Sequence, residues 1–339
     1  MKTLLFFTVV ILWLVGCDST VEVDVPRSAP KVTVNAFFTP DSVWSVVLSK
    51  NRYILDNNQF ESLPEAEVEV WQNEQLITAL PYLSDDTYRG RSVYRATETK
   101  PLTGVPYTLR IKHPDFPTLV AQSQVPPVPQ IVSASLDVLD VRQDGSFNSN
   151  EVAYGLTLRL DDPPEENFYS LSLLIRRNDF GTTGINNDLL LIEEGISFVD
   201  IRSDDPVADN AFDNYRDELL FKDVSFNGDQ YEIKIYGVFK TDDLLYTRIF
   251  DEGFVLQENA YDRRGNIVRQ IGDTVGVNTL HVVLRNTTQE YYSYNFTRDL
   301  QASVENNPFA QPVQVFDNID SGLGVFAGYN QEERKIIPR

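Results

Sequence analysis

Cys17 has the most specific chemistry in this sequence, because it is the only cysteine among 339 residues. It follows an apolar run at residues 4–15, which is too short to cross a bilayer comfortably and is typical of a secretory signal peptide. A thiol at this point is the nucleophile needed to attach a diacylglycerol. The pattern predicts a bacterial lipoprotein with residues 1–16 as its signal peptide. The residues that a signal peptidase would recognise are Leu14, Val15 and the small Gly16.

The alternative is ordinary secretory cleavage, with Cys17 as a bystander. An exported chain with one cysteine has no disulfide framework, and a free thiol would be a liability there. Lipidation explains the single cysteine better. Two or three acyl chains give stable anchoring, at roughly 0.8 kcal/mol per buried methylene. We therefore expect the mature chain to be tethered to a membrane through Cys17 and an acidic segment at residues 17–30, without crossing the membrane.

The sequence is poor in groups for catalysis. His113 precedes Pro114, which predicts a turn at the end of a strand. His281 alternates with the apolar Leu280 and Val282, which predicts that its side chain faces solvent. Neither histidine belongs to a His-Glu-x-x-His motif, and the sequence has no Gly-x-Ser-x-Gly elbow. We assign no catalytic residue, and only catalysis by carboxylates alone remains open.

A first group of acidic residues has the spacing of part of an EF-hand calcium loop. Arg142 occupies a position where that loop needs an oxygen ligand, and strand patterns flank the segment where helices are required. We favour a hairpin turn at this point. The residues that match the calcium loop are Asp140, Asp144, Gly145 and Glu151.

A second group of acidic residues lies in and beside a polar stretch at residues 202–216. Clustered carboxylates are able to hold an oxygen-ligated cation such as calcium, but a solvated loop is the interpretation we favour. The residues of this group are Asp200, Asp204, Asp205, Asp209 and Asp213. We therefore predict no cofactor beyond the lipid on Cys17, with calcium as an open alternative.

The net charge of the chain limits its partners. It has 29 basic and 50 acidic residues, a formal charge of −21, so it lacks the clustered positive charge that neutralises nucleic-acid phosphates. The same charge argues against wide contact with anionic lipid headgroups. The acidity is adequately explained by the solubility of an exported protein.

The elements that must position these residues are strands. Residues 31–125 contain short strand patterns separated by turns, such as the alternation of Tyr107, Leu109 and Ile111 with polar residues. This segment predicts an immunoglobulin-like or transthyretin-like β-sandwich. Three prolines at residues 126–130 predict an extended linker.

Residues 131–339 predict a second β-rich domain that contains one helix and ends in an irregular, Gly-rich tail. The helix is predicted at about residues 288–305. Thr287 and Glu290 have the spacing of a capping box, and apolar residues follow at every fourth position from Tyr292. The chain is therefore predicted to be mainly β, with two β-sandwich domains.

The end of the sequence carries a distinctive motif that follows the Tyr-rich helix. Its residues are Asn307, Pro308, Phe309, Pro312, Asn318, Gly322, Gly324 and Phe326. The motif resembles the end of a family of Bacteroidetes lipoproteins catalogued as domain of unknown function 4249. The start is similar too, with an acidic Val23-Asp24-Val25-Pro26 tether before Pro30-Lys31-Val32-Thr33-Val34-Asn35-Ala36. We interpret the motif residues as structural, since glycines permit turns and close backbone approach.

The resemblance implies an outer-membrane lipoprotein, often encoded beside a TonB-dependent receptor, on the cell surface or the periplasmic face. It implies no reaction. We therefore expect a non-catalytic binding or accessory component of an outer-membrane uptake complex, since rigid sheets that present loops suit recognition. The alternatives are a structural lipoprotein for secretion or surface assembly, and a carboxylate-dependent glycan hydrolase.

Overall fold

The structure is a computed structural model that describes residues 29–52, 61–86, 91–143, 150–182, 189–208, 216–240, 260–261, 267–268, 274–304, 310–311 and 313–336. Cys17, its recognition residues and most of the acidic tether lie outside these ranges. So do Asn307, Pro308, Phe309 and Pro312 of the terminal motif. The described part of the chain is mainly β, as predicted. Within it, no helix combines the length and the apolar character needed to span a membrane.

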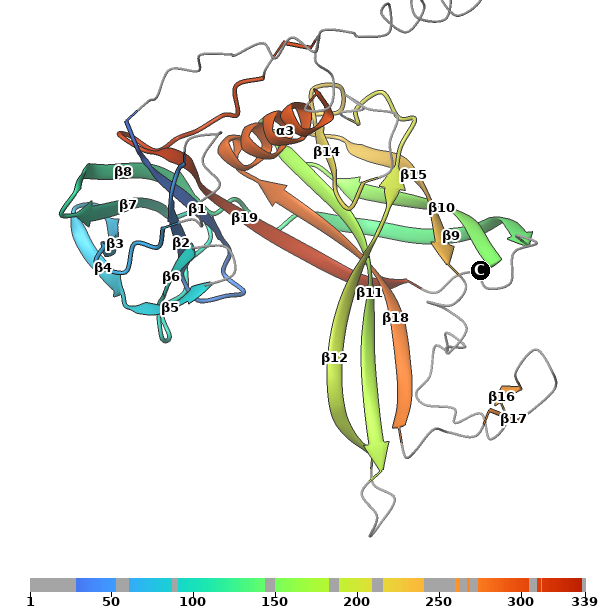
Figure 1. The fold of residues 1–339 in the computed structure, drawn as a ribbon. Helices are drawn as coiled ribbons and strands as arrows, with labels where there is room; N and C mark the ends of the chain where they lie inside the picture. The colour runs from blue at the N-terminus through green and yellow to red at the C-terminus, as the bar shows by residue number, and fades with distance from the viewer. Residues whose placement is uncertain are drawn as a thin grey trace, which may run out of the picture.

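The N-terminal half forms two facing layers of strands (Figure 1). One layer has the order β4-β3-β7-β8, and the other contains β1, β2, β6 and β5. Their bounds are β1 Val32–Phe38, β2 Ser45–Lys50, β3 Glu67–Gln72, β4 Gln75–Leu80, β5 Tyr82–Asp86, β6 Arg91–Arg95, β7 Pro106–His113 and β8 Phe116–Gln124. The predicted alternation in β7 is confirmed, because Tyr107, Leu109 and Ile111 are buried between the layers.

The second half contains a larger pair of layers. One sheet has the order β13-β15-β10-β9, and it faces β12, β11 and β18 across a second core. The bounds are β9 Gln130–Gln143, β10 Asn150–Asp161, β11 Phe168–Thr182, β12 Leu189–Val199, β13 Ile201–Arg202, β14 Leu219–Lys222, β15 Gln230–Lys240, β16 Ala260–Tyr261, β17 Ile267–Val268 and β18 Thr274–Thr287. In Figure 1, β11, β12 and β18 continue past the body as a long three-stranded ribbon.

The C-terminal strand β19 (Leu323–Ile336) joins the two halves. Its first part pairs in parallel with β1, and its second part pairs antiparallel with β18. The prediction of an irregular tail is therefore wrong from Leu323 onward, whereas residues 313–319 have no regular secondary structure. The glycines here allow the backbone of β19 to approach its neighbours closely, and residues with both faces covered show no alternation in the sequence.

The two cores meet near the Pro-rich segment but are not separate in sequence. Val125 is the last residue of the first core before this segment, and Ile131 is the first residue of the second core. Phe326, which the sequence assigns to the second domain, packs instead in the first core. Ile336, at the other end of β19, packs in the second core. One strand thus contributes to both cores.

The predicted helix is confirmed as α3 (Gln289–Val304), which lies over β19 and β14 (Figure 1). Tyr291 and Tyr292 are buried against Val325 and Phe168. The predicted capping residue was off by one position. The Oγ1 atom of Thr288 accepts a hydrogen bond from the backbone N–H of Tyr291 at 3.4 Å. The hydroxyl of Thr287 donates instead to the carbonyl of Phe168.

Candidate binding cleft

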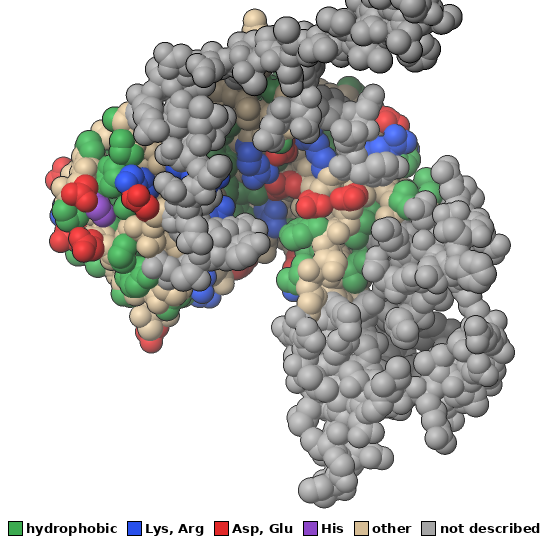
Figure 2. Space-filling view, in the orientation of Figure 1, with side chains coloured by type: hydrophobic (Ala, Val, Ile, Leu, Met, Phe, Trp, Pro, Cys, Tyr) green, Lys and Arg blue, Asp and Glu red, His purple; other side chains and the backbone are tan. Residues whose placement is uncertain are grey.

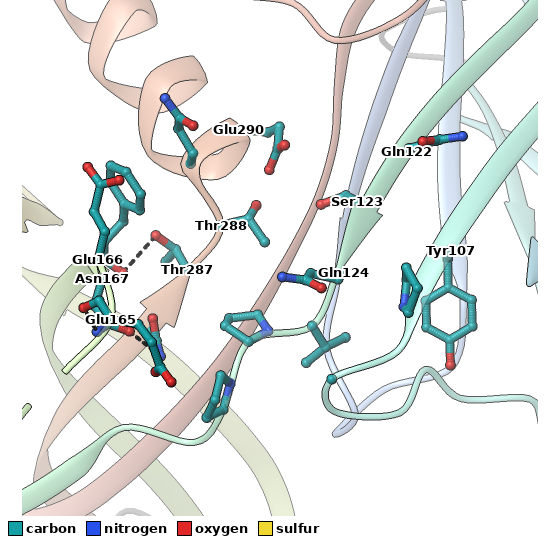
Figure 3. A pocket seen from close by; sticks show the side chains of 18 of the residues that line it. Tyr107, Gln122, Ser123, Gln124, Glu165, Glu166, Asn167, Thr287, Thr288 and Glu290 are labelled. Atoms are coloured by element: carbon teal, nitrogen blue, oxygen red, sulfur yellow. Dashed lines mark hydrogen bonds between the residues drawn. The ribbon is translucent and has the colours of Figure 1, made fainter. Parts of the chain in front are cut away.

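A cleft of about 880 Å³ lies between the two halves of the molecule (Figure 3). The end of the β4-β3-β7-β8 sheet and the Pro-rich segment form one wall. The β10–β11 loop, the end of β18 and the start of α3 form the other. The lining residues that carry the argument below are Asn73, Glu74, Thr108, Gln122, Ser123, Gln124, Glu165, Glu166, Asn167, Asn286, Thr287, Thr288, Gln289 and Glu290.

The β10–β11 loop is held rigidly by a buried hydrogen-bond network. The side-chain amide of Asn167 donates to the carbonyls of Pro163 at 3.2 Å and Glu165 at 2.6 Å. Its backbone N–H donates to the Asp223 carboxylate at 2.7 Å. The Asn286 amide donates to the side-chain oxygen of Asn167 at 3.4 Å and so ties the loop to β18. Rigid positioning of this loop fixes where Glu165 and its neighbour enter the cleft.

Asp162 anchors the other end of the same loop. Its carboxylate accepts hydrogen bonds from the Tyr169 hydroxyl and, at 2.9 Å, from the Gly228 backbone N–H. Burial raises the pKa of Asp162, although both hydrogen bonds oppose this. Burial also raises the pKa of Tyr169, which therefore stays a neutral donor to Asp162. The pair is a structural support beneath the loop and does not line the cleft.

The opposite wall comes from the outer face of a sheet and from a hairpin tip. Because Tyr107 and Leu109 point into the first core, Thr108 points outward, and its strand partner Gln122 does the same. Asn73 and Glu74 form the tip of the β3–β4 hairpin with φ values of 46° and 64°. Positive φ at both positions is the geometry of a tight hairpin turn. Figure 3 shows Ser123 and Gln124 facing Glu290 and Thr288 across the cleft.

The charge of the cleft is entirely negative among the residues that line it. Four glutamates contribute carboxylates and no Lys or Arg contributes a positive charge, although both charge types are interspersed over the face of the molecule in Figure 2. The glutamates are Glu74, Glu165, Glu166 and Glu290. An anionic ligand would be repelled here. Amides, hydroxyls and carboxylates together suit a ligand rich in hydrogen-bonding groups.

The predicted acidic cluster is only partly described. The Asp205 carboxylate is engaged in hydrogen bonds within the protein. It accepts one from the Val207 backbone N–H at 3.1 Å and one from the Tyr231 hydroxyl at 2.7 Å. Burial raises the pKa of Tyr231 to about 12. Asp200 hydrogen-bonds to Asp217, whose pKa is raised by burial and by this contact. Asp204 is also described, whereas Asp209 and Asp213 lie outside the described residues.

The structure brings no metal-binding group together among the described residues. Of the EF-hand-like residues, Asp140 and Glu151 lie on the antiparallel strands β9 and β10, whose pairing continues to Gln143 and Asn150. Strands on both sides agree with the favoured hairpin. Asp144 and Gly145 lie outside the described residues.

Of the sequence-based predictions for the two histidines, one is confirmed and one is wrong. His113 ends β7, and its Nδ1 accepts a hydrogen bond from the Asp115 backbone N–H at 3.1 Å, so the predicted turn is confirmed. The prediction that His281 faces solvent is wrong. Its side chain is only 15% exposed, and Nδ1 lies 2.7 Å from the Glu333 carboxylate. Arg176 pairs with the same carboxylate through two contacts of 2.6 Å.

The described residues of the terminal motif hold β19 in place. The Asn318 side chain exchanges hydrogen bonds with the Phe326 backbone, at 2.8 Å to its carbonyl and 2.9 Å from its N–H. At Gly322, a Cβ atom would lie 2.4 Å from the Leu119 side chain, and at Gly324, 1.9 Å from the Val34 carbonyl oxygen. These contacts agree with the structural interpretation of the motif, and none of its described residues lines the cleft.

Sequence reasoning missed the cleft. Its residues come from separate segments, and the only motif among them, the predicted capping box of Thr287 and Glu290, indicates a helix start and not a binding site. One local signal was present at residues 161–167, where two prolines and several acidic residues separate two strand patterns and mark a structured loop.

The described residues form a mainly β fold that includes the helix α3, with a polar, acidic cleft between its two larger cores. The chain belongs to the family described as Domain of unknown function (DUF4249), whose model matches residues 18–335. A comparison with curated proteins gave no match.

Solved structures show only distant likeness. The three N-terminal domains of the bacteriophage RB49 highly immunogenic outer capsid protein are 10% identical, with 91% of this chain and 70% of that chain covered and a TM-score of 0.18. The BSP domain of a biofilm-associated protein is 8% identical, with 95% and 62% covered and a TM-score of 0.17. The B domain of a biofilm-associated protein is 7% identical, with 90% and 85% covered and a TM-score of 0.17.

Proposed function

We propose that this protein is a non-catalytic binding component that takes a ligand into the cleft between its two cores. The observation that carries the proposal is the pairing of a polar, acidic cleft with walls held in fixed positions by buried hydrogen bonds. Walls that are ordered before binding reduce the entropy lost when a ligand is captured. The cleft volume of about 880 Å³ falls within the range of small-molecule sites.

The cellular setting belongs to the same proposal. The predicted signal peptide at residues 1–16, followed by Cys17, supports a lipid anchor in the outer membrane. The resemblance of both ends of the chain to lipoproteins encoded beside TonB-dependent receptors supports an uptake complex. The protein would present its cleft to the ligand and the receptor would transport it. A role in secretion or surface assembly remains the alternative setting.

Affinity purification of the full chain from native membranes tests the proposal. We expect a TonB-dependent receptor in the complex and a mass on the N-terminal cysteine equal to its acyl groups. The Cys17→Ser variant is the matched control, because it removes the lipid attachment and leaves every described residue unchanged. Purified wild-type complexes without such a receptor would contradict the uptake role.

A carboxylate-dependent glycan hydrolase is the second candidate, because four glutamates line the cleft. Two carboxyl groups on opposite sides of a glycosidic bond are enough for its hydrolysis. Glu165, Glu166 and Glu290 lie on one wall of the cleft (Figure 3), and Glu74 at the β3–β4 hairpin tip lies on the facing wall. Release of new reducing ends from an oligosaccharide by the wild-type protein, and its loss in Glu290→Gln, would favour this candidate over simple binding.

A further inference from the structure

Trp71 lies on the outer face of the β4-β3-β7-β8 sheet, beside the cleft. Its strand partner is Thr108, and the strand partner of Thr108 is Gln122. Directly paired residues point to the same side of a sheet. The three side chains therefore form one row across β3, β7 and β8, and the last two line the cleft.

The indole ring of Trp71 is fixed in place by two charged neighbours. Its Nε1 donates a hydrogen bond to the Glu69 carboxylate at 3.1 Å. The Arg110 guanidinium lies over one ring face, with its central carbon 4.7 Å from the ring centroid. Trp71 is half-buried, so part of its ring surface is accessible to a ligand, and an aromatic ring offers a flat apolar surface for stacking. Because the ring is already ordered, stacking against it costs little side-chain entropy.

We propose that this row and the cleft form one extended site for a neutral oligosaccharide, in which Trp71 stacks against a sugar ring and the cleft amides bind hydroxyls. This inference rests on the proposed binding function. Each sugar hydroxyl is both a donor and an acceptor, which side-chain amides and carboxylates complement. Strands lie about 4.8 Å apart, so the row extends about 10 Å from β3 to β8 and requires a ligand of more than one sugar unit.

The side chains that line the cleft favour a neutral sugar over an acidic saccharide or a basic peptide. The lining has six Asn or Gln side chains and four Ser or Thr side chains against four carboxylates. An acidic saccharide would be repelled by those carboxylates. A basic peptide is the competing occupant, but the Trp71 end of the row carries Arg110 as well as Glu69, so it adds no net negative charge to attract one.

Binding of defined probes to the full lipidated chain in nanodiscs tests the inference. The probes are the neutral hexasaccharides of maltose, cellulose, xylan and mannan type, the acidic hexagalacturonate, and hexalysine. We expect at least one neutral hexasaccharide to bind and hexagalacturonate not to bind. Binding of hexalysine alone, or of no neutral probe, would overturn the inference.

Substitutions locate the site. Trp71→Ala should lower the affinity for the bound hexasaccharide about tenfold, and Gln122→Ala should lower it as well. Phe198→Ala is the matched control, because this aromatic side chain is 49% exposed on β12, far from the row in sequence and sheet order, and its loss should leave affinity unchanged. Equal affinity in wild type, Trp71→Ala and Gln122→Ala would overturn the inference.

The outcome of these measurements is independent of receptor co-purification. If hexalysine binds and the receptor co-purifies, the binding function stands and the oligosaccharide inference fails. If a neutral hexasaccharide binds and no receptor is found, the inference stands and the uptake role fails.

Discussion

Gly324 occupies a position in β19 that no other residue fits without strain. Its φ is +106°, and a Cβ atom would lie 1.9 Å from the carbonyl oxygen of Val34 in β1. We expect Gly324→Ala to lower the free energy of unfolding by about 2–4 kcal/mol, through backbone strain and the loss of close pairing between the two strands. The urea midpoint, followed by tryptophan fluorescence, measures this because Trp44 and Trp71 both lie in the N-terminal half.

Gly104 provides the matched control for this prediction. It also has a positive φ, +75°, but a Cβ atom there would meet nothing within 4 Å. Gly104→Ala should therefore cost only about 1 kcal/mol of backbone strain. An equal loss in both variants would show that close packing of β19 on β1 is not the cause.

His281 gives the stability of the protein a dependence on pH. Burial lowers its pKa, although the neighbouring Glu333 carboxylate opposes this. The native imidazole thus stays neutral at pH values where the unfolded chain is protonated. Because the unfolded state binds more protons, stability should fall as the pH drops below about 6.5. His281→Gln should flatten the change in urea midpoint between about pH 7.5 and 5.5, and an unchanged slope would contradict this assignment.

Glu333 acts in a separate and lower pH range. Its hydrogen bonds from Arg176 lower its pKa, so its contribution to stability is present above the ordinary glutamate value of about 4.3 and is lost as the pH falls through the native value. The sequence placed His281 correctly on the face opposite Leu280. It could not reveal that this face is covered, because Arg176 and Glu333 come from strands far away in the chain.

At the scale of elements, the start of α3 is set by Thr288. Thr288→Ala removes the acceptor for the Tyr291 N–H and should cost about 1 kcal/mol. Faster hydrogen exchange of the amides in the first turn is the expected readout. Ser303→Ala, which removes a hydroxyl from the exposed last turn, should leave those amides unchanged. Equal exchange in the wild type and Thr288→Ala would contradict the assignment of the cap.

Elements with local patterns were predictable, and those defined by distant partners were not. Alternation revealed β7, and fourfold spacing with a polar cap revealed α3 to within a residue. The strand β19 was missed because Gly322, Gly324 and Gly328 suggest turns, while they actually permit contacts with the backbones of β1 and β8 and with Leu119. The cleft was hidden for the same reason, since no local pattern records which loops meet.

At the scale of the molecule, β19 should couple the stability of the two cores. Ile336 is buried in the second core, whereas the tryptophans report on the first half. Ile336→Ala should cost about 2–5 kcal/mol and shift the fluorescence transition together with the far-ultraviolet circular dichroism transition. A shift in circular dichroism alone would mean that the two halves unfold independently.

The parallel pairing of β1 with β19 has a consequence for biosynthesis. Thr33 pairs with Leu323, 290 positions later in the chain. At about 5–20 residues per second, a ribosome needs roughly 15–60 s to produce the partner of β1 after β1 itself. During that interval one edge of an apolar strand has no native neighbour, and such edges invite aggregation. The edge of β1 is therefore the part of the N-terminal core that we expect to be most exposed to aggregation until the last strand is available.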